Sequence, residues 1–456
     1  MIIDVLVAEI GSTTTAVNAF TNIKTNNPRF LGQGYAQTTI SEGDVTIGLN
    51  QAIEDLKQKL NATSLTWQES FASSSAAGGL KMTVHGLVYD MTVKAAKEAA
   101  LGAGANIHLI SAGKLNLNDL QQIKKISPNI ILIAGGVDYG EKDTALYNSQ
   151  VLAELQLNIP IIYAGNIANR QEVIDIFRKN QQEEYLSITS NVYPRIDELV
   201  VEPVRQVIQN LFEKHIINAP GMHKVKETIN HHIMPTPGAV MMASKLLYDH
   251  LGNIVTFDVG GATTDIHSVC EVNESTSKIT FEPEPLAKRT VEGDLGVFIN
   301  KDNIINLYGK EVLAKRINVS LLELEDMLNN YQAIPNPKQM PLTEVLSSIA
   351  LDYALKRHAG HLTNLFGPSG KTTIVEGKDL SDVKYIIATG GALCRLDNRK
   401  TIISNIIDKY EPKVLKPSNK ATILFDNNYI MASLGVLSMS YPQAALYLLK
   451  NSLSLR

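Results

Sequence analysis

The chain has 456 residues, which is roughly three times the usual size of one domain, so several domains are expected. Hydrophobic residues make up 44% of it and charged residues 19%, an ordinary globular composition that excludes a disordered, collagen-like or coiled-coil protein. The 42 Lys and Arg residues nearly balance the 46 Asp and Glu residues, and the net charge of −4 gives no bulk attraction to nucleic acid or anionic lipid. Small molecules or proteins are the expected partners.

The cysteines and the N-terminal residues indicate the compartment. Cys270 and Cys394 lie far apart and form neither a CxxC pair nor a disulfide framework, as is typical of a reducing environment. The N-terminal MIIDVLVAEIGSTTT has a short apolar run, carries Asp4 and lacks a basic leader, so it predicts a strand and not a signal peptide. No stretch approaches the roughly twenty apolar residues of a membrane span. We expect a cytoplasmic protein without a membrane segment; whether it forms a homo-oligomer stays open.

The chain begins with a predicted β-hairpin. A β-rich run over residues 2–10 ends in Gly11-Ser12-Thr13-Thr14-Thr15 and resumes over residues 16–20, which is typical of two strands joined by a tight turn. Apolar residues at helical spacing then predict a helix over residues 45–60.

Residues 67–189 have a different pattern, in which predicted helices and strands alternate. Helices are predicted over 95–103, 115–126, 144–155 and 170–179, and strands over 107–110, 130–134 and 160–164. Repeated β-α-β alternation with Gly at the strand ends is typical of a parallel, doubly wound sheet. We therefore predict an inserted α/β domain.

Two strand ends of this inserted domain carry polar residues beside glycine. Gly135-Gly136 is followed by Asp138, and Gly165 by Asn166, at positions where open parallel sheets often bind ligands. Neither turn has the GxGxxG pattern. A docking surface, a second ligand site and a folded spacer all stay open for this domain.

The second half of the chain repeats the layout of the start. Helices are predicted within 192–215, which includes Glu202, and over 239–250. The run IVTFDVGGATTDIHSV then gives a strand, a glycine and hydroxyl turn, and another strand. A third glycine turn, in YIIATGGALCRL, ends a strand and is predicted to open a short helix. A last helix over 429–440 carries Ala432, Ser433 and Gly435, whose small size would allow close helix packing.

Both hairpin turns have the chemistry of a phosphate cradle. Their backbone N–H groups and hydroxyls come from Gly11, Ser12, Thr13 and Thr14 in the first turn and from Gly260, Gly261, Thr263 and Thr264 in the second. An acid ends the first strand of each hairpin, Glu9 or Asp258, where it could hold the water shell of a Mg²⁺ that bridges those phosphates. One such turn is common in any hairpin, but two copies with strand-end acids predict a clamp on one triphosphate.

These motifs in this order resemble the actin, sugar kinase and Hsp70 superfamily of ATPases. The resemblance implies an α/β chain with the actin-like ATPase fold, in which two RNase H-like domains close on Mg-ATP and a parallel α/β domain is inserted. It implies that the two hairpin turns hold the phosphates and that Gly390, Gly391 and Ala392 approach the adenosine. It also implies that the helices near Glu202 and at 432–435 form the interdomain hinge.

The resemblance implies that the chain is divided into five segments. We expect residues 1–66 as the first part of RNase H-like domain I, 67–190 as the inserted domain, 191–250 as the remainder of domain I with a connecting helix, 251–427 as RNase H-like domain II, and 428–456 as C-terminal hinge helices.

More narrowly, the chain is similar to the glutamate mutase accessory protein family, of the GlmL or MutL type. The similarity runs nearly end to end, through SSSAAGGLKMTVHGLV, LGAGANI, IILIAGGVDYGE, IIYAGN, TVEGDLG, GKDLSDVKYIIATGGALCRL and YPQAALYLLKNSL. It implies an ATP-dependent reactivating chaperone that exchanges damaged cobalamin for intact cofactor. The implied partners are an adenosylcobalamin-dependent mutase or aminomutase and ATP or ADP; GTP in place of ATP stays open.

The sequence departs from the family patterns at two places. Glu9 stands where the superfamily usually has Asp, and its extra methylene can still reach a metal-bound water. The family's TVEGDLGMR continues here with Val297 and Phe298, so an expected arginine is absent and a nucleotide role for this loop is weakened.

The resulting hypothesis is hydrolysis of ATP by water. Glu9 and Asp258 would contact metal-bound water, and Asp265 or Glu202 would orient the attacking water. Loss of the γ-phosphate would open the lobes and loosen the cobalamin site of a bound mutase. Two alternatives stay open: a small-molecule kinase, which needs a catalytic aspartate that the sequence does not reveal, and an actin-like structural protein.

Overall fold

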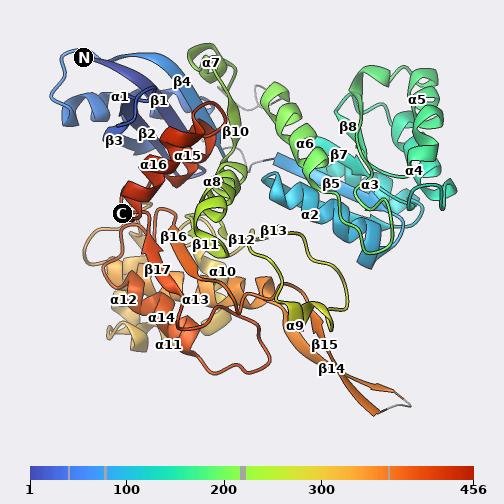
Figure 1. Ribbon diagram of the computed structural model, residues 1–456. Coiled ribbons are helices and arrows are strands. Elements are labelled where there is room, and N and C mark those ends of the chain that lie inside the picture. The colour runs from blue at the N-terminus through green and yellow to red at the C-terminus, as the bar shows by residue number, and fades with distance from the viewer. Residues whose placement is uncertain (40–41, 76–79, 216–221, 368–369, 456) are drawn as a thin grey trace. The chain divides into compact units, whose positions relative to one another are not determined.

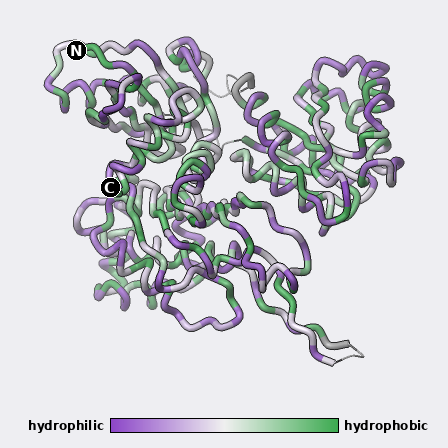
Figure 2. Tube along the Cα trace, in the orientation of Figure 1, coloured by the Kyte–Doolittle hydropathy of each residue, from purple (hydrophilic) through white to green (hydrophobic). Residues whose placement is uncertain are grey.

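The computed structural model describes residues 1–39, 42–75, 80–215, 222–367 and 370–455 (Figure 1). The chain divides into two compact units. Unit 1 comprises Met1–Ala77, Ala219–Glu282 and Leu286–Arg456, and unit 2 comprises Gly78–Asn218 with Pro283–Pro285. Hydrophobic residues follow the central strands of both units, while the connecting loops are largely hydrophilic (Figure 2). Each unit thus has a hydrophobic core of its own.

Lobe 1 of unit 1 is built on a five-stranded sheet in the order β10-β4-β1-β2-β3. Its strands are β1 (Ile2–Ile10), β2 (Thr14–Thr21), β3 (Arg29–Gln37), β4 (Thr66–Ser74) and β10 (Ile233–Pro235). The first three form an antiparallel meander, and β4 and β10 then add in parallel. Helices α1 (Val45–Lys59) and α7 (Met222–Thr228) belong to this lobe, and Asp44 caps α1 by accepting a hydrogen bond from the Thr46 backbone N–H at 2.9 Å.

Lobe 2 of unit 1 repeats the same strand order. Its sheet runs β13-β12-β11-β16-β17, again with three antiparallel strands followed by two parallel ones. The strands are β11 (Ile254–Val259), β12 (Thr264–Val269), β13 (Ala287–Glu292), β16 (Tyr385–Thr389) and β17 (Thr422–Phe425). Two sheets of this order are two RNase H-like domains, so unit 1 has the predicted actin-like ATPase architecture.

Helices and one long hairpin complete lobe 2. The helices are α9 (Glu274–Ser277), α10 (Lys301–Tyr308), α11 (Lys310–Arg316), α12 (Leu321–Asn329), α13 (Met340–His358) and α14 (Arg399–Asp408). Strands β14 (His361–Gly367) and β15 (Gly370–Glu376) pair in the hairpin, which projects at the bottom of Figure 1. The prediction of a helix directly after Gly390 is wrong, because residues 391–395 form a turn and α14 begins only at Arg399.

Three helices link the two lobes of unit 1. Helix α8 (Thr236–Leu251) leads from β10 to β11, and α15 (Met431–Leu437) packs on it; α16 (Pro442–Ser452) follows. A Cβ on Gly435 would lie 1.8 Å from the Ala239 carbonyl oxygen, so the two backbones touch there. The predicted close packing through small residues is therefore confirmed, and Asn18 adds a hydrogen bond to Ser433 at 2.8 Å.

Unit 2 contains a parallel sheet in the order β6-β5-β7-β8-β9. Its strands are β5 (Leu80–Gly86), β6 (Ala105–Ala112), β7 (Ile130–Ile133), β8 (Ile161–Tyr163) and β9 (Leu186–Ile188), and its α-helices are α2 (Lys94–Gly102), α3 (Leu117–Ile126), α4 (Asp143–Glu154), α5 (Arg170–Lys179) and α6 (Glu202–His215). Chain order 2-1-3-4-5 across the sheet is the doubly wound, flavodoxin-like arrangement. The predicted parallel α/β architecture is confirmed.

The boundaries of this inserted part differ from those expected at 67–190. Residues 66–74 form β4, which is hydrogen-bonded to β1 in lobe 1, because this strand continues the parallel half of that sheet. At the other end α6 belongs to unit 2 and begins at Glu202, so residues 192–201, which precede it, are not helical. The helix predicted over 429–440 is also shorter in the structure, since α15 runs only over Met431–Leu437, and a further helix, α16, follows it.

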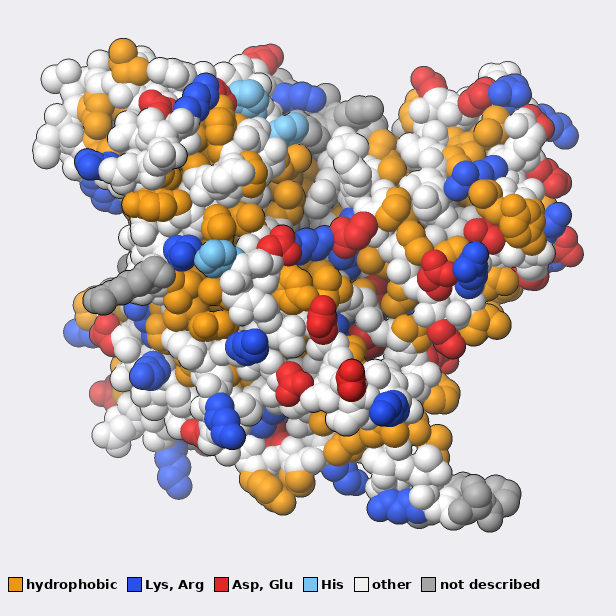
Figure 3. Space-filling model, viewed as in Figure 1, with side chains coloured by type: hydrophobic (Ala, Val, Ile, Leu, Met, Phe, Trp, Pro, Cys, Tyr) orange, Lys and Arg blue, Asp and Glu red, His pale blue; other side chains and the backbone are white. Residues whose placement is uncertain are grey.

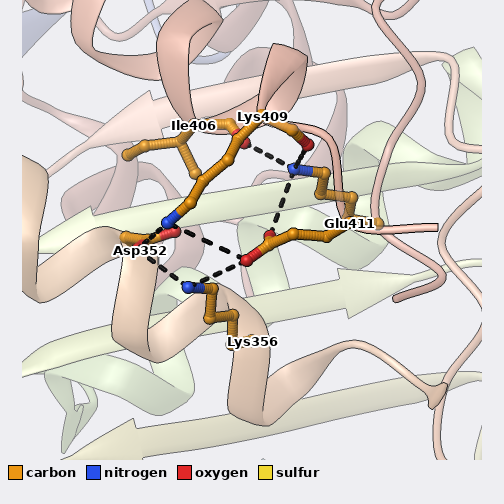
Figure 4. A network of polar contacts seen from close by, with 6 residues as sticks. Asp352, Lys356, Ile406, Lys409 and Glu411 are labelled. Carbon is orange, nitrogen blue, oxygen red and sulfur yellow. Dashed lines mark hydrogen bonds and ion pairs between the residues drawn. The ribbon is translucent and has the colours of Figure 1, made fainter. Parts of the chain in front are cut away.

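A network of ion pairs ties α13 to the end of α14 in lobe 2 (Figure 4). The Asp352 carboxylate accepts hydrogen bonds from Lys356 at 3.1 Å and from Lys409 at 3.0 Å. Glu411 pairs with Lys356 at 3.0 Å and with Lys416 at 3.4 Å. Three lysines thus meet two carboxylates.

Charge on the molecular surface is mixed. On the face shown in Figure 3, Lys and Arg side chains are interspersed with Asp and Glu side chains and do not form a field of one sign. Among the described residues, no helix is both long and apolar enough to cross a membrane.

Candidate nucleotide site

The two predicted hairpin turns have the same geometry. In the first, the Gly11 N–H donates to the Thr14 carbonyl at 3.0 Å; in the second, the Gly260 N–H donates to the Thr263 carbonyl at 2.9 Å. A Cβ on Gly11 would lie 2.7 Å from the Thr14 carbonyl oxygen, which explains glycine at this position. Lobe 1 and lobe 2 therefore each present one turn of four residues at the end of a central strand.

The two turns lie against each other. A Cβ built on Gly261 would lie 2.9 Å from Thr13 Cγ2 and 3.0 Å from Thr13 Oγ1, so the second turn leaves room for the first only because it has glycine there. Beside this contact a cleft encloses about 660 Å³ including its open mouth. Its lining is Thr13, Thr14, Gly260, Gly261, Val297, Phe298, Tyr331, Gln332, Ala333, Ile334, Pro335, Met340, Thr343, Gly391, Ala392, Arg395, Leu396 and Tyr429.

The third glycine turn reaches the same cleft. Gly390 has φ of +89°, and a Cβ there would lie 2.4 Å from Asp258 Oδ1 and 2.6 Å from the Val259 backbone nitrogen. The Ala392 N–H donates to the Val259 carbonyl at 3.3 Å. Strand β16 therefore ends directly against β11, which places Gly391 and Ala392 on the cleft wall.

Glu9 ends β1 behind the cleft wall. Its Oε1 accepts a hydrogen bond from the Tyr429 hydroxyl at 2.8 Å, while its Oε2 is buried without a hydrogen-bond partner among the described residues. Burial raises the pKa of Glu9 to about 7; the Tyr429 hydrogen bond and the Arg395 charge oppose this, and the Asp426 charge adds to it. The carboxylate is thus costly to ionise until a cation approaches.

Asp258 holds the equivalent position in lobe 2. Burial, followed by the charges of Asp265 and Glu9, raises its pKa well above the usual range, and Arg289 only partly offsets them. Asp426 is also buried, and burial raises its pKa although Ser452, at 2.5 Å, and two backbone N–H groups hydrogen-bond to it. Carboxyl groups therefore lie behind the cleft wall, and the nearby cationic side chains are too few to offset the cost of burying their charge.

Asp265 differs from Glu9 in that both of its carboxylate oxygens have hydrogen-bond partners. Arg289 donates to its Oδ1 from Nε at 2.8 Å and approaches it with Nη2 at 2.6 Å, and both side chains are buried. Its Oδ2 accepts a hydrogen bond from the Thr263 hydroxyl at 2.9 Å. With both oxygens engaged, Asp265 is suited to hold Thr263 in the second turn rather than to accept a proton from water.

The other predicted hydroxyls face different partners. Ser12 donates to the Ser75 carbonyl at 3.0 Å, and Thr264, which is fully buried, donates to the Leu295 carbonyl at 2.7 Å. Both serve to hold their turns in place. Of the residues predicted to bind nucleotide, the cleft lining contains Thr13, Thr14, Gly260, Gly261, Gly391 and Ala392.

Glu202 is not among the residues that meet at the cleft. It lies in unit 2, in the first turn of α6, and its carboxylate accepts a hydrogen bond from Arg205 at 2.6 Å. The cleft is lined by residues of unit 1 alone. The structure therefore gives no geometric support for Glu202 as the group that orients a water.

Sequence reasoning missed several cleft residues. Arg395 stacks on the ring of Tyr35 at 4.7 Å and on that of Tyr429 at 5.9 Å, close in sequence to the glycine turn at Gly390. The only signal for it was its place two residues after the GGAL motif in GGALCR. Tyr429 (φ +50°) was predicted merely as a helix start, although its hydroxyl holds Glu9. The segment 331–335 carries no recognisable motif and reaches the cleft through packing of lobe 2.

The loop after β13 supports the second turn. The N–H groups of Val297 and Phe298 donate to the carbonyls of Gly260 and Gly261 at 3.1 and 2.9 Å, and both side chains line the cleft. An apolar wall therefore stands where the family pattern has arginine, so this loop contacts the cleft through packing rather than charge.

The sequence of the chain is similar to that of known proteins over nearly its whole length. The family model described as "MutL protein" matches residues 5–453. "Protein MutL" of Clostridium tetanomorphum is 35% identical over 462 residues, an alignment that covers 98% of this chain and 98% of the relative. The chain belongs to the MutL family. The narrower resemblance seen in the sequence is thereby confirmed for this MutL-family chain.

Solved structures resemble the chain more remotely. A nucleotide-free acetone carboxylase gives a TM-score of 0.43 at 13% identity and covers 96% of this chain and 70% of its own. A nucleotide-free diol dehydratase-reactivating factor gives a TM-score of 0.35 at 8% identity and covers 96% of this chain and 99% of its own. Similarity at this level does not establish that the MutL-family chain shares their activities.

Proposed function

We propose that this chain is an ATP-hydrolysing reactivating factor for an adenosylcobalamin-dependent mutase or aminomutase of the glutamate mutase type, and that hydrolysis drives release or exchange of damaged cobalamin. One observation carries the nucleotide part: the hairpin turns of the two lobes touch through Gly261 and Thr13, and with Gly391 and Ala392 they line one cleft. Membership of the MutL family supports the mutase as partner.

The lining of the cleft suits a nucleotide. The glycine turns offer backbone N–H groups to phosphates. At the lobe 2 side, Phe298, Tyr331 and Met340 provide an apolar wall for a base, and Thr343 bonds the Tyr331 hydroxyl at 2.5 Å.

The carboxyl groups behind the turns fit a Mg²⁺ that keeps its water. The buried, unpartnered Oε2 of Glu9 and the raised pKa of Asp258 are both features that a cation would relieve. Among the described residues no group of three or more His, Cys, Asp or Glu side chains is placed to hold a metal ion directly. Glu9 and Asp258 would therefore hold Mg²⁺ through its water ligands, and the ion would neutralise phosphate charge.

The chain's own residues would then assist attack of water on the γ-phosphorus. Thr13, Thr14, Gly260 and Gly261 would bind the phosphates and Asp265 would position Thr263 through its hydroxyl. No side chain at the cleft is assigned as general base. A clamp that positions phosphates without a strong base is consistent with slow hydrolysis that a partner stimulates.

The test uses Gly261→Val with Gly293→Val as matched control, because a Cβ on Gly261 meets Thr13 whereas nothing lies within 4 Å of one on Gly293. We expect calorimetry to show Mg-ATP binding by the wild type and the control, and binding at least about tenfold weaker for Gly261→Val. Phosphate release should rise when an inactivated mutase is added. Equal binding by both variants, or no nucleotide uptake by the wild type, would contradict the proposal.

The same assay separates the alternatives. Phosphate release without any acceptor favours the ATPase, while strict dependence on a small acceptor would favour a kinase of the same fold. ATP-dependent filaments detected by light scattering would favour an actin-like structural protein.

A further inference from the structure

The large apolar side chains that unit 2 exposes gather on one side of its sheet. Among the described residues of that unit they are Val88, Tyr89, Leu117, Tyr139, Tyr147 and Ile196. Val88 and Tyr89 follow β5, Leu117 follows β6, Tyr139 and Tyr147 follow β7, and Ile196 follows β9. All six therefore lie in loops or in the first two helical turns after the carboxyl ends of the parallel strands, a set that we call the carboxyl edge.

The opposite edge of the same sheet is different. There the large apolar side chains of the helix-to-strand connections, at Leu155, Leu157, Ile159 and Tyr185, are partly buried. At the carboxyl edge, by contrast, Leu117 and Tyr139 are each 80% exposed. Scattered exposed apolar residues need no explanation, but confinement of all of them to one edge of a sheet marks an interaction surface.

Buried amide side chains fix the loops of the carboxyl edge to one another. Asn166 Oδ1 accepts a hydrogen bond from the Tyr139 N–H at 2.9 Å, and Asn191 donates to the Gly136 carbonyl at 3.0 Å and to Asp138 at 2.9 Å. The loops after β7, β8 and β9 are thus cross-linked. A surface held in this way loses little conformational entropy when it binds.

The loop after β6 is fixed in the same manner. Asn148 of α4 accepts a hydrogen bond from the Leu115 N–H at 2.9 Å and donates to the Gly113 carbonyl at 3.0 Å. Lys114 lies over the ring of Tyr147 at 5.3 Å. The loop that leads to Leu117 is therefore held against α4, the helix that carries Tyr147.

The same hydrogen bonds weigh against a small ligand at this edge. Asp138 and Asn166, which follow the glycine turns predicted as ligand sites, bond to each other's loops: Asp138 accepts from the Ile167 N–H at 3.0 Å and Asn166 donates to the Glu141 carbonyl at 3.1 Å. Small-ligand sites depend on a few polar groups that converge on the ligand, and here those groups are already paired. An apolar, tyrosine-rich centre is instead typical of protein interfaces.

Charge around the carboxyl edge indicates which kind of protein surface it fits. In the loops and first helical turns of this edge, the exposed cations are Lys114, Lys142 and Arg195, and the exposed acids are Asp90, Glu141, Asp143, Glu172, Asp197, Glu198 and Glu202. The rim is therefore net acidic. A complementary surface has an apolar centre surrounded by Lys and Arg.

We propose that the carboxyl edge of unit 2 docks the partner mutase, through a mutase surface with an apolar centre and a basic rim. This inference rests on the proposed function and adds the part of the chain that recognises the partner. Tyr139 and Ile196 are its central anchors, because the Asp138 N–H donates to the Pro194 carbonyl at 2.9 Å and so brings their two loops together.

The experiment uses the full chain and a purified adenosylcobalamin-dependent mutase from the same organism, with binding followed by biolayer interferometry. The test variant is Tyr139→Ser with Ile196→Ser. The matched control is Tyr410→Ser in unit 1, since Tyr410 is 87% exposed and Tyr139 is 80% exposed. We expect mutase binding roughly 10- to 100-fold weaker in the test variant, unchanged binding in the control, and weaker wild-type binding as salt is raised.

Other outcomes would overturn the inference. They are wild-type affinity in the test variant, a wild-type dimer in sedimentation that the test variant dissociates, and uptake of free adenosylcobalamin by the wild type that the test variant loses. Mg-ATP binding by each protein separates this inference from the proposed function. If nucleotide and mutase both bind normally to the test variant, only the docking surface is wrong; if the wild type takes up no nucleotide, the proposed function is wrong as well.

Discussion

Two groups of charged side chains in unit 1 differ in their balance. In the network of Figure 4, burial would raise the pKa of Glu411, but the Lys356 hydrogen bond and the charges of Lys356, Lys416 and Lys409 outweigh it and lower that pKa. Behind the cleft, burial prevails and raises the pKa values of Glu9 and Asp258. The first group is balanced in charge and holds α13 to the end of α14, whereas Arg289 and Arg395 supply too little positive charge to offset burial in the second.

The largest expected effect comes from pushing the third glycine turn away from Asp258. Gly390→Ala places a Cβ 2.4 Å from Asp258 Oδ1 at a positive φ, whereas Gly391→Ala meets nothing within 4 Å. We expect Gly390→Ala to lower the free energy of unfolding by about 3 kcal/mol and to abolish measurable nucleotide binding. Gly391→Ala should keep its stability. Urea unfolding and calorimetric titration measure both, and equal stabilities for the two variants would contradict the described contact.

Neutralising Glu9 should separate stability from binding. Its folded pKa of about 7 lies above the unfolded value of 4.5, so its contribution to stability is complete below pH 4.5 and is lost as pH rises through 7. Glu9→Gln removes that loss and should raise the free energy of unfolding at pH 8 by roughly 3 kcal/mol without ligand, with no gain at pH 4. Mg-ATP affinity should fall at the same time. Thermal and urea unfolding at the two pH values check this, and a stability loss at pH 8 would count against the assigned pKa.

A proton should leave the site when the metal-bound nucleotide enters. Because Glu9 is about half protonated at pH 7 and a cation favours its ionised form, we expect release of roughly half a proton from this group, with a further contribution from Asp258. Calorimetry in buffers of different ionisation enthalpy counts the protons. The release should be smaller in Glu9→Gln, and identical values in both proteins would assign the protons elsewhere.

The smallest effect is expected in the balanced network. Glu411→Gln should lower the free energy of unfolding at pH 7 by about 1 kcal/mol and leave nucleotide binding intact. Since the folded pKa of Glu411 is lowered, its contribution is present above the unfolded pKa and is lost as pH falls through the folded one. The difference between variant and wild type should therefore shrink in acid, as urea unfolding at several pH values would reveal. At neutral pH, Glu9→Gln should raise the free energy of unfolding and Glu411→Gln should lower it, and this opposite effect is the clearest test of the difference between the two groups.

The sequence revealed those parts of the site that are encoded locally. The turns at Gly11 and Gly260 and the turn at Gly390 could be predicted, because glycine is required where backbones approach and the flanking strands are strongly β-forming. Arg395 and Tyr429 could not, because their roles depend on lobe 2 contacting Tyr35 and Glu9 of lobe 1.

The errors have the same physical origin. Residues 66–74 look like the start of the inserted domain, since a buried parallel strand has the same pattern in either sheet, and only its pairing with β1 assigns it to lobe 1. Glu202 looked equivalent to an acid of the hinge, yet α6 packs within unit 2. Long-range pairing, which no local pattern encodes, decided both cases.

The bare contact between Gly435 and the Ala239 carbonyl has a mechanical consequence. Side chains that interdigitate between two helices resist rotation of one helix against the other, because they must separate first. Where two backbones touch through a glycine, no side chain interdigitates at that point. Helix α8 also connects β10 of lobe 1 to β11 of lobe 2. This helix crossing can therefore serve as a hinge about which the two lobes rotate. A methyl group at residue 435 would lie 1.8 Å from the Ala239 carbonyl oxygen and would therefore force the two helices apart.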